Sequence, residues 1–253
     1  MREAIIEIRG LKKRFGELVV LDGVDLAVRT GETMVIMGLS GTGKSVLVKH
    51  VLGLLKPDEG EVTVDGLNLA RAGRLQRTSV LRKIGMSFQN AALFDSMSAR
   101  ENVAFPLREH LELGEDEIQR RVDDALRLVG LPELKGAYPS ELSGGMRKRV
   151  GLARALILDP EIVMFDEPTT GLDPILGDMI IETIRRTREA VGYTCVVVTH
   201  DLKLTFSLAD QVALLHRGRI VFDGSAEEFR KSKDPAVVQF IAGRSSGGPI
   251  EVK

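Results

Sequence analysis

A short apolar run followed at once by a glycine-rich octapeptide is the feature of this chain that most restricts its fold. The run from Thr33 to Met37 is uninterrupted, as in a strand that is buried on both faces of a parallel sheet. Residues 38–45 then read G-L-S-G-T-G-K-S, and Val46 to Leu55 has the pattern of a helix. This order of strand, loop and helix matches the Walker A pattern G-x-x-x-x-G-K-[ST] and predicts a phosphate-binding loop.

Each residue type in this loop has a chemical reason. Glycines let the backbone turn so that successive N–H groups point at phosphate oxygens. Lys44 would reach the β and γ phosphates, Ser45 would place its hydroxyl on Mg²⁺, and the following helix would add its positive N-terminal end. We therefore expect the nucleotide-binding residues to be Gly38, Leu39, Ser40, Gly41, Thr42, Gly43, Lys44 and Ser45.

Two adjacent carboxylates follow a second apolar run. Residues 162–165 read I-V-M-F, and Asp166 and Glu167 come directly after them. Because burying bare charge is expensive, a buried strand that ends in two acids needs a partner of opposite charge. A magnesium-bound nucleotide supplies one. Asp166 would hold Mg²⁺ through water, the Walker B role, and Glu167 would orient or deprotonate the attacking water.

Polar side chains also end two other predicted strands. His200 follows the β-branched run from Thr194 to Thr199, and Gln89 follows the short strand from Ile84 to Phe88. Ligands of α/β folds bind beyond the carboxyl ends of parallel strands. His200 is therefore expected to donate a hydrogen bond to the γ-phosphate, and Gln89 is a third candidate at this edge.

Composition and element order indicate a soluble α/β protein. The apolar fraction is 43%, the formal net charge is -1 and Cys195 is the single cysteine, so neither general nucleic-acid binding nor an intrachain disulfide is expected. No apolar run approaches the ~20 residues of a membrane span. A β-rich opening that includes a strand from Ala4 to Arg9 precedes a mainly helical lobe from Ser98 to Leu158. Strands resume at Ile162, and Gln211 to Leu215 with Arg219 to Phe222 is expected to form a hairpin.

Residues 142–146, L-S-G-G-M, identify a family. With the other motifs, they make the chain similar to the ATP-binding subunits of ABC transporters. The motifs occur along the chain in the order that is typical of that family. They are Phe15 (A-loop aromatic), Gly38 to Ser45 (Walker A), Gln89 (Q-loop), Leu142 to Met146 (signature), Asp166 and Glu167 (Walker B), Asp173 (D-loop) and His200 (H-loop).

The resemblance implies a P-loop NTPase of the ABC type, an α/β core with an antiparallel β subdomain and an inserted helical subdomain. It implies one domain over residues 4–243, followed by a flexible tail at 244–253. Within that domain, the core and β subdomain would lie at 4–90 and 160–243 and the helical subdomain at about 91–159. ATP and Mg²⁺ would be the cofactors, with Ser45, Gln89 and Asp166 near the metal and Glu167, His200 and Gln89 catalytic. Two copies would form a head-to-tail dimer in which one signature, Leu142, Ser143, Gly144, Gly145 and Met146, contacts the ATP of the partner.

Met146 stands where the family usually has glutamine. With the stretches 87–95, 101–110 and 234–240, it makes the chain resemble the Mla/Mce branch of lipid transporters. That resemblance implies phospholipid transport that maintains outer-membrane lipid asymmetry. It also implies an MlaE-like permease, an MlaD-like MCE protein and an MlaB-like STAS protein as partners, and a peripheral location on the cytoplasmic face of the bacterial inner membrane. The segment from Gln89 to Arg100, with Leu93, Phe94 and Met97, would contact the permease or form lobe core.

Three other readings share parts of this pattern. An ATPase subunit of an importer for amino acids or other small polar solutes would have every catalytic residue named above. A non-transport ABC ATPase acting on DNA or ribosomes would carry a long coiled coil or two cassettes, and this chain has one cassette and no heptad tract. A nucleotide-binding regulator without turnover is disfavoured by Glu167 and His200. Phe15 could also be a simple core residue.

Overall fold

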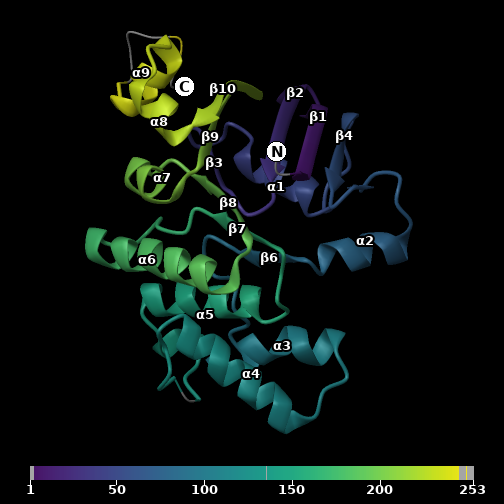
Figure 1. The fold of residues 1–253 in the computed structure, drawn as a ribbon, viewed down its shortest axis with the longest axis vertical. Helices are drawn as coiled ribbons and strands as arrows, with labels where there is room; N and C mark the ends of the chain where they lie inside the picture. The colour runs from purple at the N-terminus through teal and green to yellow at the C-terminus, as the bar shows by residue number, and fades with distance from the viewer. Residues whose placement is uncertain (1–2, 135, 245–248, 250–253) are drawn as a thin grey trace. The chain divides into compact units, whose positions relative to one another are not determined.

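The computed structural model describes residues 3–134, 136–244 and 249 (Figure 1). The chain divides into two compact units, one made of Met1–Leu81 with Val196–Lys253 and the other of Arg82–Cys195. Most of the predicted tail, residues 245–248 and 250–253, lies outside the described residues.

The first unit contains an antiparallel sheet of four strands. They are β1 (Ala4–Phe15), β2 (Leu18–Arg29), β4 (Glu59–Val64) and β5 (Leu67–Asn68), in the order β2-β1-β4-β5 (Figure 1). Alternate residues of β1, such as Ile6 and Ile8, are buried, as expected for a strand with one face on a core. Asp65 and Gly66 have positive φ and close the turn between β4 and β5. The antiparallel β subdomain expected from the family resemblance is thus confirmed.

The same unit holds the strands that precede the glycine-rich loop and His200. In hydrogen-bonded order they are β10 (Arg219–Ser225), β9 (Gln211–His216), β3 (Thr33–Met37) and β8 (Thr194–Thr199), whose first two residues belong to the second unit. β3 and β9 are parallel and fully apolar at their centres. β9 and β10 form the predicted hairpin, which turns at Arg217 and Gly218 with positive φ.

Helices of the first unit are α1 (Lys44–Val51), α2 (Arg74–Leu81), α7 (Leu202–Leu208), α8 (Ala226–Lys231) and α9 (Pro235–Ile241). The predicted helix from Val46 to Leu55 is wrong at its C-terminal end, because α1 stops at Val51. Gly53 has a φ of 63°, and the N–H groups of Leu54 and Leu55 both donate to the Lys49 carbonyl. These bonds satisfy the last helical carbonyls and turn the chain away, which ends the helix.

The second unit combines two parallel strands with helices. β6 (Ile84–Ser87) and β7 (Ile162–Asp166) are paired in parallel, so Gln89 and Glu167 follow neighbouring carboxyl ends. The helices are α3 (Ala99–His110), α4 (Glu115–Leu128), α5 (Gly144–Leu156) and α6 (Pro174–Val191), with a short 3-10 turn at Pro139–Glu141 (Figure 1). A Cβ at Gly85 would lie 2.2 Å from the Ala155 carbonyl oxygen, so only glycine permits this approach of β6 to α5.

Helical amphipathicity explains how the lobe packs. Residues Ile118, Val122, Ala125 and Leu126 of α4 are buried at i, i+4, i+7 and i+8 spacing, whereas its acidic and basic side chains form exposed ion pairs. α3 begins with a capping box between Ser98 and Glu101. The mainly helical stretch predicted from Ser98 to Leu158 is confirmed. No helix among the described residues is long and apolar enough to cross a membrane.

Candidate nucleotide-binding and hydrolysis site

The glycine-rich loop has the backbone that a phosphate cradle requires. Gly41 and Gly43 have φ values of 80° and 103°, which residues with a side chain rarely adopt. A Cβ at Gly43 would also lie 2.9 Å from Leu21 Cδ2. α1 starts at Lys44, so the unsatisfied N–H groups of its first turn lie directly after the loop. A loop of this kind is suited to an anion.

Lys44 is buried, with 7% of its surface exposed, and its ammonium lies over the loop. Its Nζ donates hydrogen bonds to the main-chain oxygens of Gly38 at 2.7 Å and Leu39 at 3.0 Å. Ser45, the next residue, is exposed. A buried lysine and an exposed serine at the start of one helix suit a phosphate oxygen and a hard metal ion, respectively.

Two other predicted site residues belong to the first unit. Phe15 ends β1 with 48% of its surface exposed, and Lys13 Nζ lies 5.6 Å from its ring centroid. It is therefore not a core residue. His200 is exposed and lies between β8 and α7, where the Asp201 carboxylate accepts a hydrogen bond from Leu204 N and caps the helix. The ring of His200 thus stands at the carboxyl end of a buried strand.

The acidic pair lies at the end of β7 in the second unit. Phe165 is buried, Asp166 and Glu167 are half-buried, and Glu167 has a φ of 47°. Thr170 contacts Glu167 twice: its hydroxyl donates to Oε2 at 3.2 Å, and its N–H donates to the main-chain oxygen at 3.3 Å. A glutamate in the left-handed region is uncommon and is held there by its surroundings.

Lys148 was not among the residues predicted from sequence. It lies on α5, and its Nζ donates to the main-chain oxygens of Gln89 at 3.0 Å and Glu167 at 3.3 Å. Burial lowers the pKa of the Lys148 ammonium, and the charge of Glu167 acts in the opposite direction. One helix residue therefore links the segments after β6 and β7.

The predicted signature and D-loop begin two helices. Ser143 is the N-cap of α5 and accepts a hydrogen bond from Met146 N at 3.2 Å. Asp173 is the N-cap of α6, where one carboxylate oxygen accepts from the N–H groups of the two residues after Pro174, at 2.9 and 3.0 Å. A Cβ at Gly144 would lie 3.2 Å from Leu172 Cδ2, so the two motifs touch. Leu142 is buried and Gly145 faces Leu176.

Two polar side chains, the half-buried Arg154 and the buried Asn102, hold the main chain of the segment after Gln89. Arg154 of α5 donates to the main-chain oxygens of Ala91 at 2.6 Å and Ala92 at 2.8 Å, both in the left-handed region. Asn102 of α3, which is fully buried, accepts from Phe94 N and donates to three carbonyls of residues 94–98. Phe94 remains 43% exposed although its ring lies 5.0 Å from that of Phe105.

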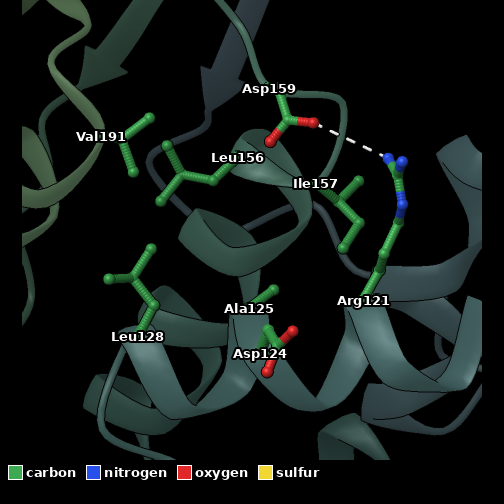
Figure 2. Close-up of a pocket in the computed structure, with 8 residues that line it drawn as sticks. All are labelled: Arg121, Asp124, Ala125, Leu128, Leu156, Ile157, Asp159 and Val191. Carbon is green, nitrogen blue, oxygen red and sulfur yellow. Dashed lines mark ion pairs between the residues drawn. The ribbon is translucent and has the colours of Figure 1, made fainter.

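The described residues also line cavities away from these motifs. Figure 2 shows one of about 330 Å³ in the second unit, with the Arg121–Asp159 ion pair of 3.7 Å at its edge. Another, of about 320 Å³ in the first unit, is lined by residues that include His50 and Arg77. Neither is lined by a predicted site residue. Among the described residues, no group of three His, Cys, Asp or Glu side chains could hold a metal ion.

The motifs and the fold define an ATP-binding cassette, and the chain belongs to the ABC transporter family. The family model described as "ABC transporter" matches residues 21–170, which is more than half of the chain. This range includes the glycine-rich loop, Gln89, the signature and the acidic pair.

Curated relatives match the chain over nearly its full length. "Intermembrane phospholipid transport system ATP-binding protein MlaF" of Haemophilus influenzae is 41% identical over 100% of this chain and 96% of its own. "Protein TRIGALACTOSYLDIACYLGLYCEROL 3, chloroplastic" of Arabidopsis thaliana is 43% identical over 98% of this chain and 76% of its own. "Probable ribonucleotide transport ATP-binding protein mkl" of Mycobacterium leprae is 40% identical over 96% of this chain and 70% of its own.

A solved structure shares the fold. The "dimeric structure of a post-hydrolysis state of the ATP-binding cassette MJ0796 bound to ADP and Pi" superposes with a TM-score of 0.79 at 32% sequence identity. The match covers 87% of this chain and 98% of that one. The ABC-type α/β fold predicted from the motifs is therefore confirmed.

Proposed function

We propose that this chain is the ATP-hydrolysing subunit of an ABC transporter that moves phospholipid in the bacterial cell envelope. The observation that carries the proposal is the match to the Haemophilus influenzae phospholipid transport ATPase, which extends over the whole chain at 41% identity. The buried ammonium of Lys44 and the left-handed glycines of its loop give the chain the cradle that such an activity needs.

ATP would bind with its phosphates against residues 38–45. Lys44 would exchange part of its bonding to the loop carbonyls for the β and γ phosphate oxygens, and the first turn of α1 would donate N–H groups. Phe15 would stack on the adenine. Its exposed ring at the end of a strand supports this role.

Mg²⁺ fits the oxygen donors that the chain offers. Ser45 would offer a hydroxyl, Asp166 a carboxylate and Gln89 an amide oxygen, and of these residues Ser45 and Gln89 are exposed and Asp166 is half-buried. Mg²⁺ in nucleotide sites is held by one or two such groups, by water and by the phosphates themselves, so a cluster of three acidic residues is not needed. When bound, the ion would neutralise charge on the phosphates.

Glu167 and His200 would act on the attacking water and the γ-phosphate. Thr170 fixes the carboxylate of Glu167, which would orient the water and accept its proton. His200 would donate a hydrogen bond to the γ-phosphate. Together these residues would stabilise charge where it develops, which is the main source of catalysis in phosphoryl transfer.

A second copy would complete each site. The start of α5, at residues 142–146, would contact the ATP held by the partner copy, and Asp173 would lie at the same seam. The dimeric cassette that this chain resembles supports the arrangement. Met146 in place of glutamine leaves the Ser143 hydroxyl and the helix N–H groups as donors.

The cassette would dock on a permease at the cytoplasmic face of the inner membrane. The segment from Gln89 to Arg100 presents Phe94 at the surface. Hydrogen bonds from Arg154 and Asn102 to its main-chain oxygens hold it in place. We propose an MlaE-like permease as the direct partner, with MlaD-like MCE and MlaB-like STAS subunits in the same assembly. We also propose that the single domain is divided into two parts. The core with its β subdomain would comprise residues 4–90 and 160–243, and the helical subdomain would comprise residues from about 91 to 159.

Co-purification from membranes tests the substrate. The full chain, affinity-tagged in its own bacterium and extracted with detergent, should bring down a permease and an MCE protein, and mass spectrometry should find bound phospholipid.

A second candidate, transport of a polar solute, is favoured by the mycobacterial relative that is named for ribonucleotide transport. Recovery of a soluble solute receptor in place of an MCE protein would establish that candidate and contradict the lipid assignment.

A further inference from the structure

Lys148 is a cation whose resolved hydrogen bonds go to main-chain carbonyls alone. Its ammonium donates to the carbonyl oxygens of Gln89 and Glu167 at 3.0 and 3.3 Å. These residues follow β6 and β7, which are neighbouring parallel strands of the same unit. The lysine comes from a third element, α5, which begins at Gly144 within the predicted signature. One side chain therefore joins three of the motifs.

The position of this cation is unfavourable by itself. The side chain is half-buried, and burial lowers the pKa of its ammonium. Charged groups lose solvation when buried, so a half-buried ammonium costs free energy that its hydrogen bonds must offset. The next residue, Arg149, is also half-buried, and burial lowers its pKa as well. Its guanidinium, however, donates to Gly130 O at 3.0 Å and not to the segments after β6 and β7.

The backbone of Glu167 has a conformation that needs support. Its φ of 47° is a conformation that residues with a side chain adopt at a cost in free energy. Lys148 and Thr170 N both donate to its carbonyl oxygen, and the Thr170 hydroxyl donates to Oε2. The peptide is therefore held both from α5, by Lys148, and by the turn to Thr170, whose hydroxyl also holds the carboxylate.

We infer that Lys148 is a positioning residue for hydrolysis, which holds the backbone of Glu167 and Gln89 so that the Glu167 carboxylate meets the attacking water. The inference rests on the proposed ATPase function and deepens it. Lys148 touches neither water nor phosphate in this role. It acts on the rate of hydrolysis after ATP has bound, because the phosphate cradle at residues 38–45 is a different part of the chain.

The test compares variants of the full chain by steady-state phosphate release and by binding of a fluorescent ATP analogue. Lys148→Met should lower kcat by about tenfold while KM and the analogue Kd change by less than about twofold, the signature of an interaction that acts in the transition state. Lys148→Arg keeps two donors and should recover most of the rate. Arg149→Met, the matched control on the same helix, should retain the wild-type kcat.

A double-mutant cycle separates positioning from general stability. If Lys148 and Thr170 both act by fixing Glu167, their effects on kcat should not be independent. The fold-reduction of kcat in the double variant should then be smaller than the product of the fold-reductions in Lys148→Met and Thr170→Val. An unchanged kcat in Lys148→Met, an equal loss in Arg149→Met, or a rise in KM with kcat preserved would each overturn the inference. Lys148→Gln replaces Lys148→Met if the melting temperature falls. Absence of phosphate release from the wild type would instead refute the proposed function.

Discussion

The ammonium of Lys44 lies 2.7 Å from the main-chain oxygen of Gly38, six residues earlier in the chain. This bond closes the glycine-rich loop and holds a buried positive charge at its centre. Together with the bond to Leu39 O, it fixes the lysine side chain within the loop that we propose binds the phosphates.

The first prediction follows from this bond. Lys44→Ala should weaken ATP binding by about 10- to 100-fold, since hydrogen bonds to charged groups contribute about 1.5–3 kcal/mol. Calorimetric titration measures the affinity. Lys49→Ala, an exposed lysine of the same helix, is the control and should bind like the wild type. Equal affinities for the wild type and Lys44→Ala would show that the loop is not the phosphate site.

A second prediction concerns the exposed ring of Phe94. Phe94→Asp should abolish co-purification of the permease while the isolated chain keeps its ATPase rate, because an exposed carboxylate cannot be buried in an apolar interface without a partner. Val191→Asp changes a valine of the same unit with a similar exposure, 42% against 43%, and should leave co-purification intact. Full recovery of permease with Phe94→Asp would place the docking surface elsewhere.

A third prediction uses His50, a buried residue of α1. Its Nδ1 donates to Val46 O at 2.7 Å. Burial holds its pKa below the ordinary 6.5 and the charge of Lys13 adds to this, whereas the hydrogen bond to Val46 O and the charge of Asp58 act in the opposite direction. As the pH falls below about 6.5, His50 is protonated in the unfolded chain before it is protonated in the folded chain. The free energy of unfolding should therefore fall by at most about 1.4 kcal/mol for each pH unit of acidification. Above that pH both states are neutral at this residue and it has no effect.

Urea denaturation between about pH 7.5 and 5.5 checks the sign. His50→Gln should flatten the pH dependence, and His110→Gln, which changes an exposed histidine, should not. A wild-type protein that becomes more stable as the pH falls through this window, by an amount that His50→Gln removes, would contradict the prediction.

Some of the fold could be predicted because buried parallel strands have a distinctive sequence. β3, β7 and β8 are continuous apolar or β-branched runs, and each was expected within one residue of its observed bounds. The glycine-rich loop was equally plain, since its residue types are dictated by backbone geometry and phosphate chemistry. These features depend on local sequence alone.

Other features depend on contacts between distant residues. The strand expected from Ala4 to Arg9 continues to Phe15, because Lys12 and Lys13 pair with Asp22 and Leu21 of β2 although their side chains do not alternate in polarity. Short helices such as α7 and α8, of seven and six residues, are too brief for a periodic pattern.

The site shows the same limit. Gln89 and Glu167 could be predicted from their places after apolar strands. Lys148 could not, because a lysine beside Arg147 and Arg149 has the pattern of a solvated helix face. Its two hydrogen bonds form only because parallel pairing of β6 and β7 brings two carbonyls within reach of α5. A long-range contact of this kind leaves no local signal.

Complementation between two inactive variants tests the central claim, a hydrolysis site shared by two copies. Glu167→Gln should bind ATP and release almost no phosphate, and Ser143→Arg should do the same because its signature is blocked. In a mixed dimer the Glu167 of one chain would face the intact Ser143 of the other. An equimolar mixture should therefore regain roughly a quarter of the wild-type rate of phosphate release. A mixture that stays as inactive as its components, or a Ser143→Arg protein that hydrolyses ATP alone at the wild-type rate, would contradict the account.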